Sequence, residues 1–260
     1  IQEQNSYAGV TNKLLAKKAN TICVAYDGME RFFPKEKIVM TGNPVRQNLL
    51  TNSVSREEAV EYFHLDPQKK TILVLGGSLG ARTINQTLQA AIPIMQEHPE
   101  VQWIWQTGKI YIEQVKNAIS EITGEIVMGT RVGALPNLYV TDFIKDMSKA
   151  YAAADLVISR AGAGSISEFC LLHKPVILVP SPNVAEDHQT KNALALVNKE
   201  AALYVKDADA QKELVQTALH TVGDEEKLSS LSREIAKLAL PDSANVIAHY
   251  VLDLIKKNKQ

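Results

Sequence analysis

Short apolar segments alternate with amphipathic segments along most of the chain. The apolar segments predict buried β-strands at 71–75, 101–106, 138–141, 155–159 and 175–180, with a weak strand at 202–205. The amphipathic segments predict helices at 56–63, 81–97, 110–121, 146–154, 164–172, 187–198, 209–221 and 225–238. Strands that are apolar on both faces and alternate with helices form parallel sheets covered on two sides. The pattern therefore predicts a doubly wound α/β domain, which binds ligands at the carboxyl ends of its strands.

The two ends of the chain show a different pattern. Strands are predicted at 21–25 and 38–41, before a turn-rich hinge at 42–46. Residues 242–257 predict a helix whose apolar stripe needs a surface to pack on. We therefore expect residues 1–43 to be the end of an N-terminal domain and residues 44–240 to be a ligand-binding domain. Residues 241–260 are expected to form a helix that packs back on the N-terminal domain.

Composition and charge narrow the class of protein. The 260 residues are 45% hydrophobic and carry a formal net charge of -1, which is typical of a soluble globular protein. Surfaces that bind nucleic acid usually show a basic excess, so no nucleic-acid partner is expected. Cys23 and Cys170 have neither CxxC nor metal-ligand spacing, which predicts buried, reduced thiols in a cytosolic protein. No apolar run approaches the ~20 residues of a membrane span.

The first candidate site is the turn Gly-Gly-Ser-Leu-Gly at 76–80. Gly76, Gly77 and Gly80 let the backbone approach a ligand closely, and Ser78 adds a hydroxyl donor. The helix that follows offers unpaired N–H groups and a partial positive end, which together bind anions. The spacing fits neither a P-loop nor a G-x-G-x-x-G dinucleotide motif. The alternative is that the glycines only let strand and helix pack.

A second small-residue turn, Arg-Ala-Gly-Ala-Gly-Ser at 160–165, follows the strand at 155–159. Two helix starts at one edge of a sheet can face one diphosphate from two sides. Glu168 lies in the first turns of the second helix, where its carboxylate can accept hydrogen bonds from both hydroxyls of a ribose. The alternative for Glu168 is a helix-start acid that complements the helix dipole.

A third turn, at 180–193, is rich in hydrogen-bonding side chains that suit the hydroxyls of a sugar. Its candidates are Glu186, Asp187, His188, Gln189 and Asn192. No histidine or acid lies four residues after His188, so a metal site is not expected there. A Ser–His–Asp hydrolase is also disfavoured, because the sequence has no G-x-S-x-G motif.

Several ordered motifs resemble one family. The segments GNPVR, LVLGGSLGAR, DFIKDM, SRAGAGSISE and DHQTKNA, with the opening QEQNSYAGVTNK, resemble the MurG-type N-acetylglucosaminyltransferases of bacterial peptidoglycan synthesis. The resemblance covers nearly the whole chain. It implies a GT-B fold, in which two Rossmann-like domains face each other across a cleft. It also implies transfer of GlcNAc from UDP-GlcNAc to the muramoyl 4-hydroxyl of lipid I (undecaprenyl-pyrophosphoryl-MurNAc-pentapeptide), which gives lipid II.

The resemblance assigns three residues to the nucleoside. Arg46 corresponds to a nucleotide contact, Ile144 to a residue whose backbone reads uracil, and Glu168 to the acid that binds ribose. For Ile144 the alternative is a core residue, and for Arg46 a solvated surface charge.

The resemblance assigns further residues to the phosphates and the sugar. Ser78 corresponds to a phosphate-binding serine, Gln189 to the glutamine that reads the GlcNAc hydroxyls, and Asn5 to a cleft position of the first domain. The second anion-binding turn corresponds to Ala163, Gly164, Ser165, Ile166 and Ser167.

The resemblance also shows what this sequence lacks. The chain begins at Ile1, in what looks like the end of a strand, so we expect a fragment of a longer protein. The first glycine-rich loop of the family, with its histidine and the acceptor-binding segments, is expected upstream of Ile1. The catalytic base is therefore unknown here. The chain is expected to bind the donor, whereas transfer needs the missing part.

We expect an inverting displacement in which the two helix starts stabilise the leaving UDP. No DxD-like acidic pair lies at a cleft turn, so donor binding is predicted to need no metal or other cofactor.

The acceptor implied by the resemblance is bound to a membrane. The protein is therefore expected to be peripheral, at the cytoplasmic face of the bacterial inner membrane. Basic side chains near the two ends can meet anionic lipid or form a solvated face: Lys13, Lys17, Lys18, Lys256, Lys257 and Lys259. Two other functions stay open, a UDP-GlcNAc 2-epimerase and a non-catalytic donor-binding subunit.

Overall fold

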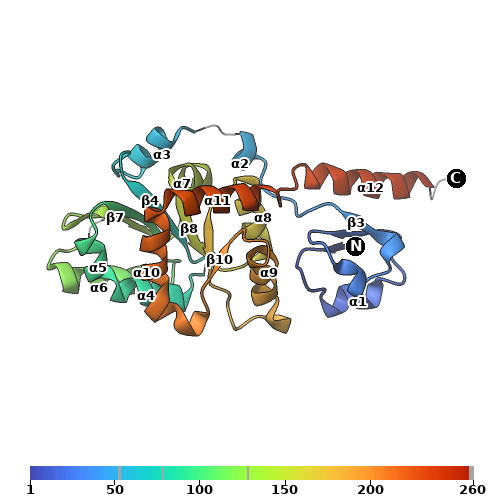
Figure 1. The fold of residues 1–260 in the computed structure, drawn as a ribbon, viewed down its shortest axis with the longest axis horizontal. Helices are drawn as coiled ribbons and strands as arrows, with labels where there is room; N and C mark the ends of the chain where they lie inside the picture. The colour runs from blue at the N-terminus through green and yellow to red at the C-terminus, as the bar shows by residue number, and fades with distance from the viewer. Residues whose placement is uncertain (52–53, 78, 128, 258–260) are drawn as a thin grey trace.

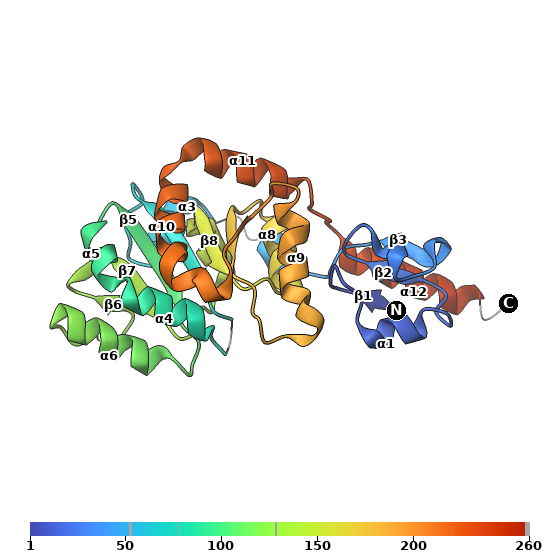
Figure 2. The ribbon, with the colours of Figure 1, turned by 60° about the horizontal axis from the view of Figure 1, so that its bottom comes forward.

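The structure, a computed structural model, describes residues 1–51, 54–77, 79–127 and 129–257. A small unit at the N-terminus and a larger α/β unit lie next to each other along the long axis (Figure 1). The C-terminal helix α12 (Ser243–Lys257) extends from the larger unit and runs beside the small one in both ribbon views (Figures 1 and 2).

The small unit is a three-stranded parallel sheet in the order β1-β2-β3. The predicted strands at 21–25 and 38–41 correspond to β2 and β3. Short helices and turns cover the sheet around a core that includes Ile22, Val24 and Met29. The elements are β1 (Gln2–Glu3), α1 (Val10–Leu15), β2 (Ile22–Val24), η1 (Met29–Arg31), η2 (Lys35–Lys37) and β3 (Ile38–Met40).

The larger unit is built on a seven-stranded sheet in the order β10-β9-β8-β4-β5-β7-β6. Every pairing is parallel except that of β6 with β7. The strands are β4 (Lys70–Leu75), β5 (Val101–Gln106), β6 (Arg131–Val132), β7 (Leu135–Thr141), β8 (Leu156–Ser159), β9 (Val176–Leu178) and β10 (Leu203–Tyr204).

The strand order confirms the predicted doubly wound fold. From β4 the chain builds outward through β5 to β7, then returns to β8 on the other side of β4 and continues to β9 and β10. The order therefore reverses between β4 and β8. In open α/β sheets the crevice outside the carboxyl ends of the strands at such a reversal is the usual place of ligand binding.

Both faces of the sheet are buried because successive side chains point to opposite sides. On β4, Ile72 and Val74 pack into one core, and Leu73 and Leu75 pack into the other. Two layers of helices cover the faces (Figure 2). The first core includes residues of α4 (Arg82–Ala90), α5 (Ile92–Glu97), α6 (Ile112–Thr123) and α10 (Ala210–Gly223). The second includes residues of α2 (Asn48–Thr51), α3 (Arg56–Tyr62), α7 (Met147–Ala153), α8 (Ala163–Leu171), α9 (His188–Val197) and α11 (Glu225–Ala236).

One predicted helix needs correction, and one short strand was not predicted. The single helix predicted at 81–97 is wrong: α4 ends at Ala90 and α5 begins at Ile92. Pro93 lies at the start of α5, where its missing N–H is tolerated, whereas in the middle of one long helix its ring would clash with a carbonyl of the preceding turn. The antiparallel edge strand β6 is too short to show a period in the sequence.

The start of α9 also differs from the prediction. The predicted helix at 187–198 begins one residue later, after the 3-10 turn η3 (Ala185–Asp187), in which Glu186 and Asp187 have φ values of 54° and 51°. A second 3-10 turn, η4 (Asp207–Asp209), precedes α10.

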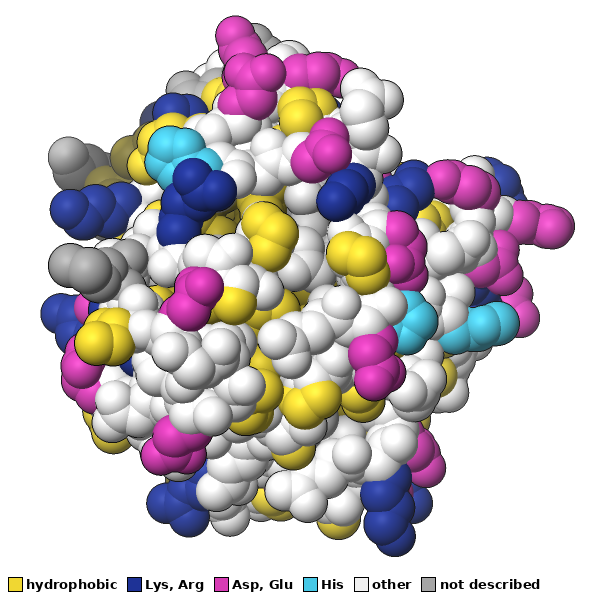
Figure 3. All heavy atoms as spheres, turned by 90° about the vertical axis from the view of Figure 1, so that its left-hand side faces the viewer, with side chains coloured by type: hydrophobic (Ala, Val, Ile, Leu, Met, Phe, Trp, Pro, Cys, Tyr) yellow, Lys and Arg dark blue, Asp and Glu magenta, His cyan; other side chains and the backbone are white. Residues whose placement is uncertain are grey.

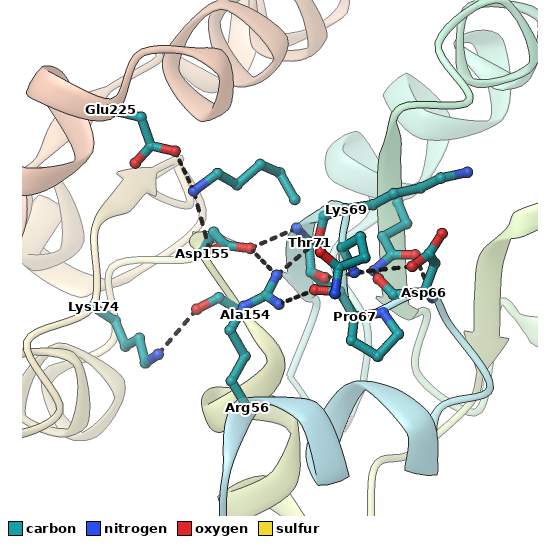
Figure 4. Close-up of polar contacts among 12 residues, drawn as sticks. Arg56, Asp66, Pro67, Lys69, Thr71, Ala154, Asp155, Lys174 and Glu225 are labelled. Atoms are coloured by element: carbon teal, nitrogen blue, oxygen red, sulfur yellow. Dashed lines mark hydrogen bonds and ion pairs between the residues drawn. The ribbon is translucent and has the colours of Figure 1, made fainter.

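A polar cluster joins four elements at the amino edge of the large sheet (Figure 4). Asp155, just before β8, accepts hydrogen bonds from Arg56 of α3 and from the backbone N–H of Thr71 in β4, each at 2.8 Å. Lys70 lies between Asp155 and Glu225 of α11. The cluster lies at the edge opposite the carboxyl ends of the strands. It therefore holds helices and strands together without occupying the edge at which such sheets bind ligands.

The surface of the large unit at the end away from the small unit carries both positive and negative side chains. Figure 3 shows Lys, Arg, Asp and Glu side chains interspersed over this face, without a patch of one sign. Across the described ranges, every helix is too short or too polar to cross a membrane.

Candidate functional site

A hollow of about 220 Å³ opens at the carboxyl edge of the large sheet, where the strand order reverses. Its walls come from the turns after β4 and β8, from the segment after β7 with α7, and from Arg46, just before α2. Six of the lining residues are Arg46, Gly77, Ile144, Gly162, Ser165 and Glu168. Turns that are far apart in the sequence thus meet at one place, as the doubly wound topology requires.

A second hollow of about 490 Å³ shares Arg160 with the first. It is lined by the start of α4, by the turn after β9 and by η4, and its walls include Gly80, Arg82, Ser181 and Gln189. The shared guanidinium is fixed from behind, because Arg160 forms an ion pair with Asp207 and donates hydrogen bonds to the carbonyls of Val179 and Pro180. A ligand that spans both hollows would pass this cation.

Two helix starts face these hollows. The residues before α4 and α8 are Ala81 and Gly162, both with extended backbone, and within the described residues neither helix start is capped by a side chain. Gly162 lines the first hollow and Ala81 the second. The first N–H groups of each helix can therefore donate to an anion, at the positive end of the helix dipole.

The glycines of the turn after β4 differ in role. Gly80 has a φ of 82°, and a Cβ there would lie 2.4 Å from the carbonyl oxygen of Thr107. A Cβ at Gly76 would lie 2.9 Å from the amide nitrogen of Ala81. At Gly77, by contrast, a Cβ would meet no atom within 4 Å. Close packing accounts for Gly76 and Gly80, whereas at Gly77 the left-handed backbone, with a φ of 73°, favours glycine, and the residue borders open space on the wall of the first hollow. The predicted phosphate ligand Ser78 lies outside the described residues.

Glu168 lies at the centre of the first hollow's polar wall. Its Oε1 accepts hydrogen bonds from Nε and Nη2 of Arg46 at 3.2 and 3.0 Å. Its Oε2 accepts a 2.7 Å hydrogen bond from the hydroxyl of Tyr151. The side chain of Glu168 is 14% exposed, and that of Arg46 is 54% exposed. The carboxylate is therefore held from two sides while its edge still reaches the hollow.

Ile144 is a core residue that also reaches the wall of the first hollow, and its contact with uracil stays a prediction. The residue is 3% exposed and belongs to the second core, yet it also lines the first hollow. The neighbouring Phe143 is 47% exposed on the same wall. A core side chain at this place fixes the backbone of the segment after β7, and an exposed aromatic ring offers a surface for a planar ligand.

Gln189 lies apart from these residues, on the wall of the second hollow. Its Oε1 accepts a 2.9 Å hydrogen bond from the backbone N–H of Ser181. This contact fixes the orientation of the amide, so its NH₂ group is left as the donor.

The other predicted residues lie elsewhere. Asn5 is in the small unit, and its Oδ1 accepts a hydrogen bond from Asn192 at 3.0 Å. Ile166 and Ser167 line a small cavity between the two units. Of the turn at 163–167, only Ser165 places its side chain on the wall of the first hollow, while Ala163 accepts a hydrogen bond from Ser167 and a Cβ at Gly164 would meet open space. Ligand contacts by these residues stay predictions.

The sequence interpretation gave no role to three residues that line the first hollow, Phe143, Tyr151 and Arg160. Phe143 lies within the quoted motif DFIKDM and Arg160 within SRAGAGSISE, so their position in the sequence was a usable signal. Tyr151 carries no such signal, because an aromatic residue in α7 fits the apolar face of the helix equally well.

Burial changes the acidity of Tyr151. The pKa of its hydroxyl is raised above the ordinary value, first by loss of solvation and then by the charge of Glu168. Tyr151 is therefore a neutral hydrogen-bond donor at physiological pH. Within the described ranges, no group of three or more His, Cys, Asp or Glu side chains is arranged to hold a metal ion.

Comparison with known proteins gives the family. The family described as "Glycosyltransferase family 28 C-terminal domain" matches residues 71–247. A protein of Bacteroides fragilis named UDP-N-acetylglucosamine--N-acetylmuramyl-(pentapeptide) pyrophosphoryl-undecaprenol N-acetylglucosamine transferase is 67% identical over 258 residues, 99% of this chain. A protein of the same name from Phocaeicola vulgatus is 64% identical over 260 residues, 100% of this chain. The chain spans 65% and 66% of the length of these two relatives.

The structural comparison agrees with the sequence comparison. The crystal structure of Acinetobacter baumannii MurG superimposes with a TM-score of 0.72 at 29% identity, over 99% of this chain and 67% of that one. The larger unit thus has the Rossmann-like architecture of a GT-B protein, and the matched region includes both glycine turns and the segment after β7. The chain belongs to glycosyltransferase family 28 and carries its C-terminal domain.

Proposed function

We propose that this chain is the donor-binding part of an inverting N-acetylglucosaminyltransferase that moves GlcNAc from UDP-GlcNAc to the muramoyl 4-hydroxyl of lipid I. The proposal rests on the convergence of Arg46, Ile144 and Glu168 on one hollow at the switch point of the sheet. The names of relatives 64% and 67% identical to this chain support the same donor and acceptor.

The arrangement suggests how the donor would lie. The nucleoside would occupy the first hollow, with its ribose hydroxyls donating to Glu168 and its base beside Ile144 and Phe143. The sugar would occupy the second hollow, within reach of Gln189. The diphosphate would then lie between the two helix starts, near Arg160.

The proposed reaction places additional negative charge on the leaving group. When the anomeric C–O bond breaks, negative charge grows on the diphosphate of UDP. Fixed N–H groups and a fixed guanidinium stabilise that charge without reorganising, and each such donor is worth ~2.7–4 kcal/mol in comparable sites. We therefore propose that donor binding needs no metal ion. Removal of the acceptor proton requires a base, which we place in the part of the relatives that this chain does not span.

Calorimetry with UDP-GlcNAc tests the donor assignment. We expect binding that is undiminished by EDTA, and about 10-fold or greater weakening in Glu168→Ala, because hydrogen bonds to a charged group contribute ~1.5–3 kcal/mol. Loss of binding in EDTA would refute the metal-free site. Unchanged affinity in Glu168→Ala would remove the ribose assignment.

A transfer assay distinguishes the proposed function from an epimerase. Incubation of the chain with UDP-GlcNAc and lipid I, with and without the N-terminal part of a relative, should give lipid II only in the mixture. Formation of an epimer without any acceptor would identify an epimerase instead. Because the acceptor is a lipid, we further propose peripheral association with the cytoplasmic face of the inner membrane. Sedimentation of the chain with anionic vesicles measures this association.

A further inference from the structure

Glu168 is the acid that the proposed function assigns to ribose, and its orientation depends on a second residue. A carboxylate that accepts from two adjacent hydroxyls must present a defined edge to them, since a rotated carboxylate reaches only one. The rotation of this carboxylate is therefore set by the side chains that donate to its two oxygens.

Arg46 and Tyr151 hold the two oxygens of Glu168 very differently. Arg46 is more than half exposed, so its ion pair is screened by water and contributes little to a fixed orientation. Tyr151 is 2% exposed, and its 2.7 Å hydrogen bond reaches the carboxylate from the protein interior. The buried contact is therefore the one that persists if Arg46 turns toward a ligand.

The position of Tyr151 is itself fixed by packing. Its ring meets Phe169 edge to face, with centroids 6.0 Å apart and planes at 80°. Tyr151 belongs to α7, whereas Phe169 and Glu168 are neighbours in α8. The ring of Tyr151 thus packs against α8, and its hydroxyl donates to Glu168 of the same helix. The hydroxyl therefore has little freedom to move away from the carboxylate.

We infer that Tyr151 is a positioning residue, which sets the Glu168 carboxylate for the ribose hydroxyls and so makes the site selective for ribonucleotides. The inference rests on the proposed function, because it assumes a uridine nucleotide in the first hollow. It adds a residue of α7, outside the family motifs, to the specificity of that site. A purely structural role for Tyr151 would affect all ligands alike.

The test compares Tyr151→Phe with the wild-type chain, using UDP and 2′,3′-dideoxy-UDP as probes in calorimetry. We expect Tyr151→Phe to bind UDP about 5- to 10-fold more weakly, the size of one lost hydrogen bond. Both proteins should bind the dideoxy nucleotide equally, within about twofold. Tyr139→Phe is the matched control, because it removes a phenolic hydroxyl from β7 at a residue that does not line the hollow. It should bind both probes as the wild type does.

The outcomes separate the inference from the proposed function. If wild type does not bind UDP, the proposed function fails and the inference with it. If wild type binds UDP and Tyr151→Phe weakens both probes equally, or neither, the inference alone is overturned. The ratio of the two dissociation constants does not depend on the folded fraction, so a partly unfolded variant still decides the question.

Discussion

At the scale of the residue, Glu168 shows how contacts decide a role that position in the chain leaves open. A glutamate near a helix start has an ordinary explanation in the helix dipole. The structure places this carboxylate between an exposed guanidinium and a buried phenol, on the wall of a hollow. A group with two hydrogen-bonding partners and one open edge is suited to recognition, because a ligand completes its hydrogen bonds.

Cys170 gives a prediction at the same scale. Burial raises the pKa of its thiol from 9.0 to about 12. The unfolded chain therefore releases this proton first as pH rises. The stability linked to the thiol is fully present below pH 9.0 and is lost progressively toward pH 12. Between pH 8 and 10.5 the wild type should lose about 1–2 kcal/mol more unfolding free energy than Cys170→Ala.

Urea unfolding of both proteins at the two pH values measures this difference. Equal losses in wild type and Cys170→Ala would contradict the raised pKa.

At the scale of the elements, polar contacts at the amino edge of the large sheet join α3, β4 and the start of β8 (Figure 4). Asp155 satisfies a backbone N–H of Thr71, a residue without exposed surface, and also pairs with Arg56. A buried donor that loses its acceptor keeps its full desolvation penalty, so this edge is sensitive to a single substitution.

Asp155→Ala should therefore lower the free energy of unfolding by about 1–3 kcal/mol. UDP affinity should stay unchanged at temperatures where the variant is folded, because the cluster lies at the edge opposite the hollows. Glu225→Ala is the control: its side chain is 74% exposed, and its loss should change stability by less than about 0.5 kcal/mol. Denaturant titration with parallel calorimetry tests both statements. A loss of UDP affinity in folded Asp155→Ala would show that the two edges are coupled.

At the scale of the whole molecule, a few polar side chains join the small unit to the large one. Asn192 of α9 is fully buried; it donates to Asn5 and to the carbonyl of Ala161, and accepts from the N–H of Ser6 at 2.8 Å. Asn43 forms a second bridge, from Gln4 to Ser167. These contacts set the placement of the two units on either side of the hinge.

Asn192→Ala should loosen this junction, because it leaves buried partners in both units unsatisfied. We expect a loss of about 1–3 kcal/mol in unfolding free energy and a larger radius of gyration in small-angle scattering. Lys199→Ala, just after the end of α9, is the control, because its ion pair with Asp27 also joins the two units but is exposed on both sides and should contribute little. Unchanged dimensions and stability in Asn192→Ala would show that other contacts hold the units together.

The fold class was predictable from the amino-acid sequence, because short apolar runs that alternate with amphipathic segments are typical of a parallel sheet covered on both faces. The sequence also located the turns at the carboxyl edge, because small residues between a strand and a helix mark a tight approach. Through the resemblance it named Arg46, Ile144 and Glu168, which line one hollow.

Features that depend on contacts between distant segments could be seen only in the folded chain. The separate roles of Gly77 and Gly80 and the partnership of Tyr151 with Glu168 are of this kind, whereas Pro93 already marks the break between α4 and α5 in the sequence. A side chain in an amphipathic helix shows the same period whether it fills the core or fixes a neighbour's carboxylate. The difference lies in which atom of another element stands opposite it, and local sequence does not encode that.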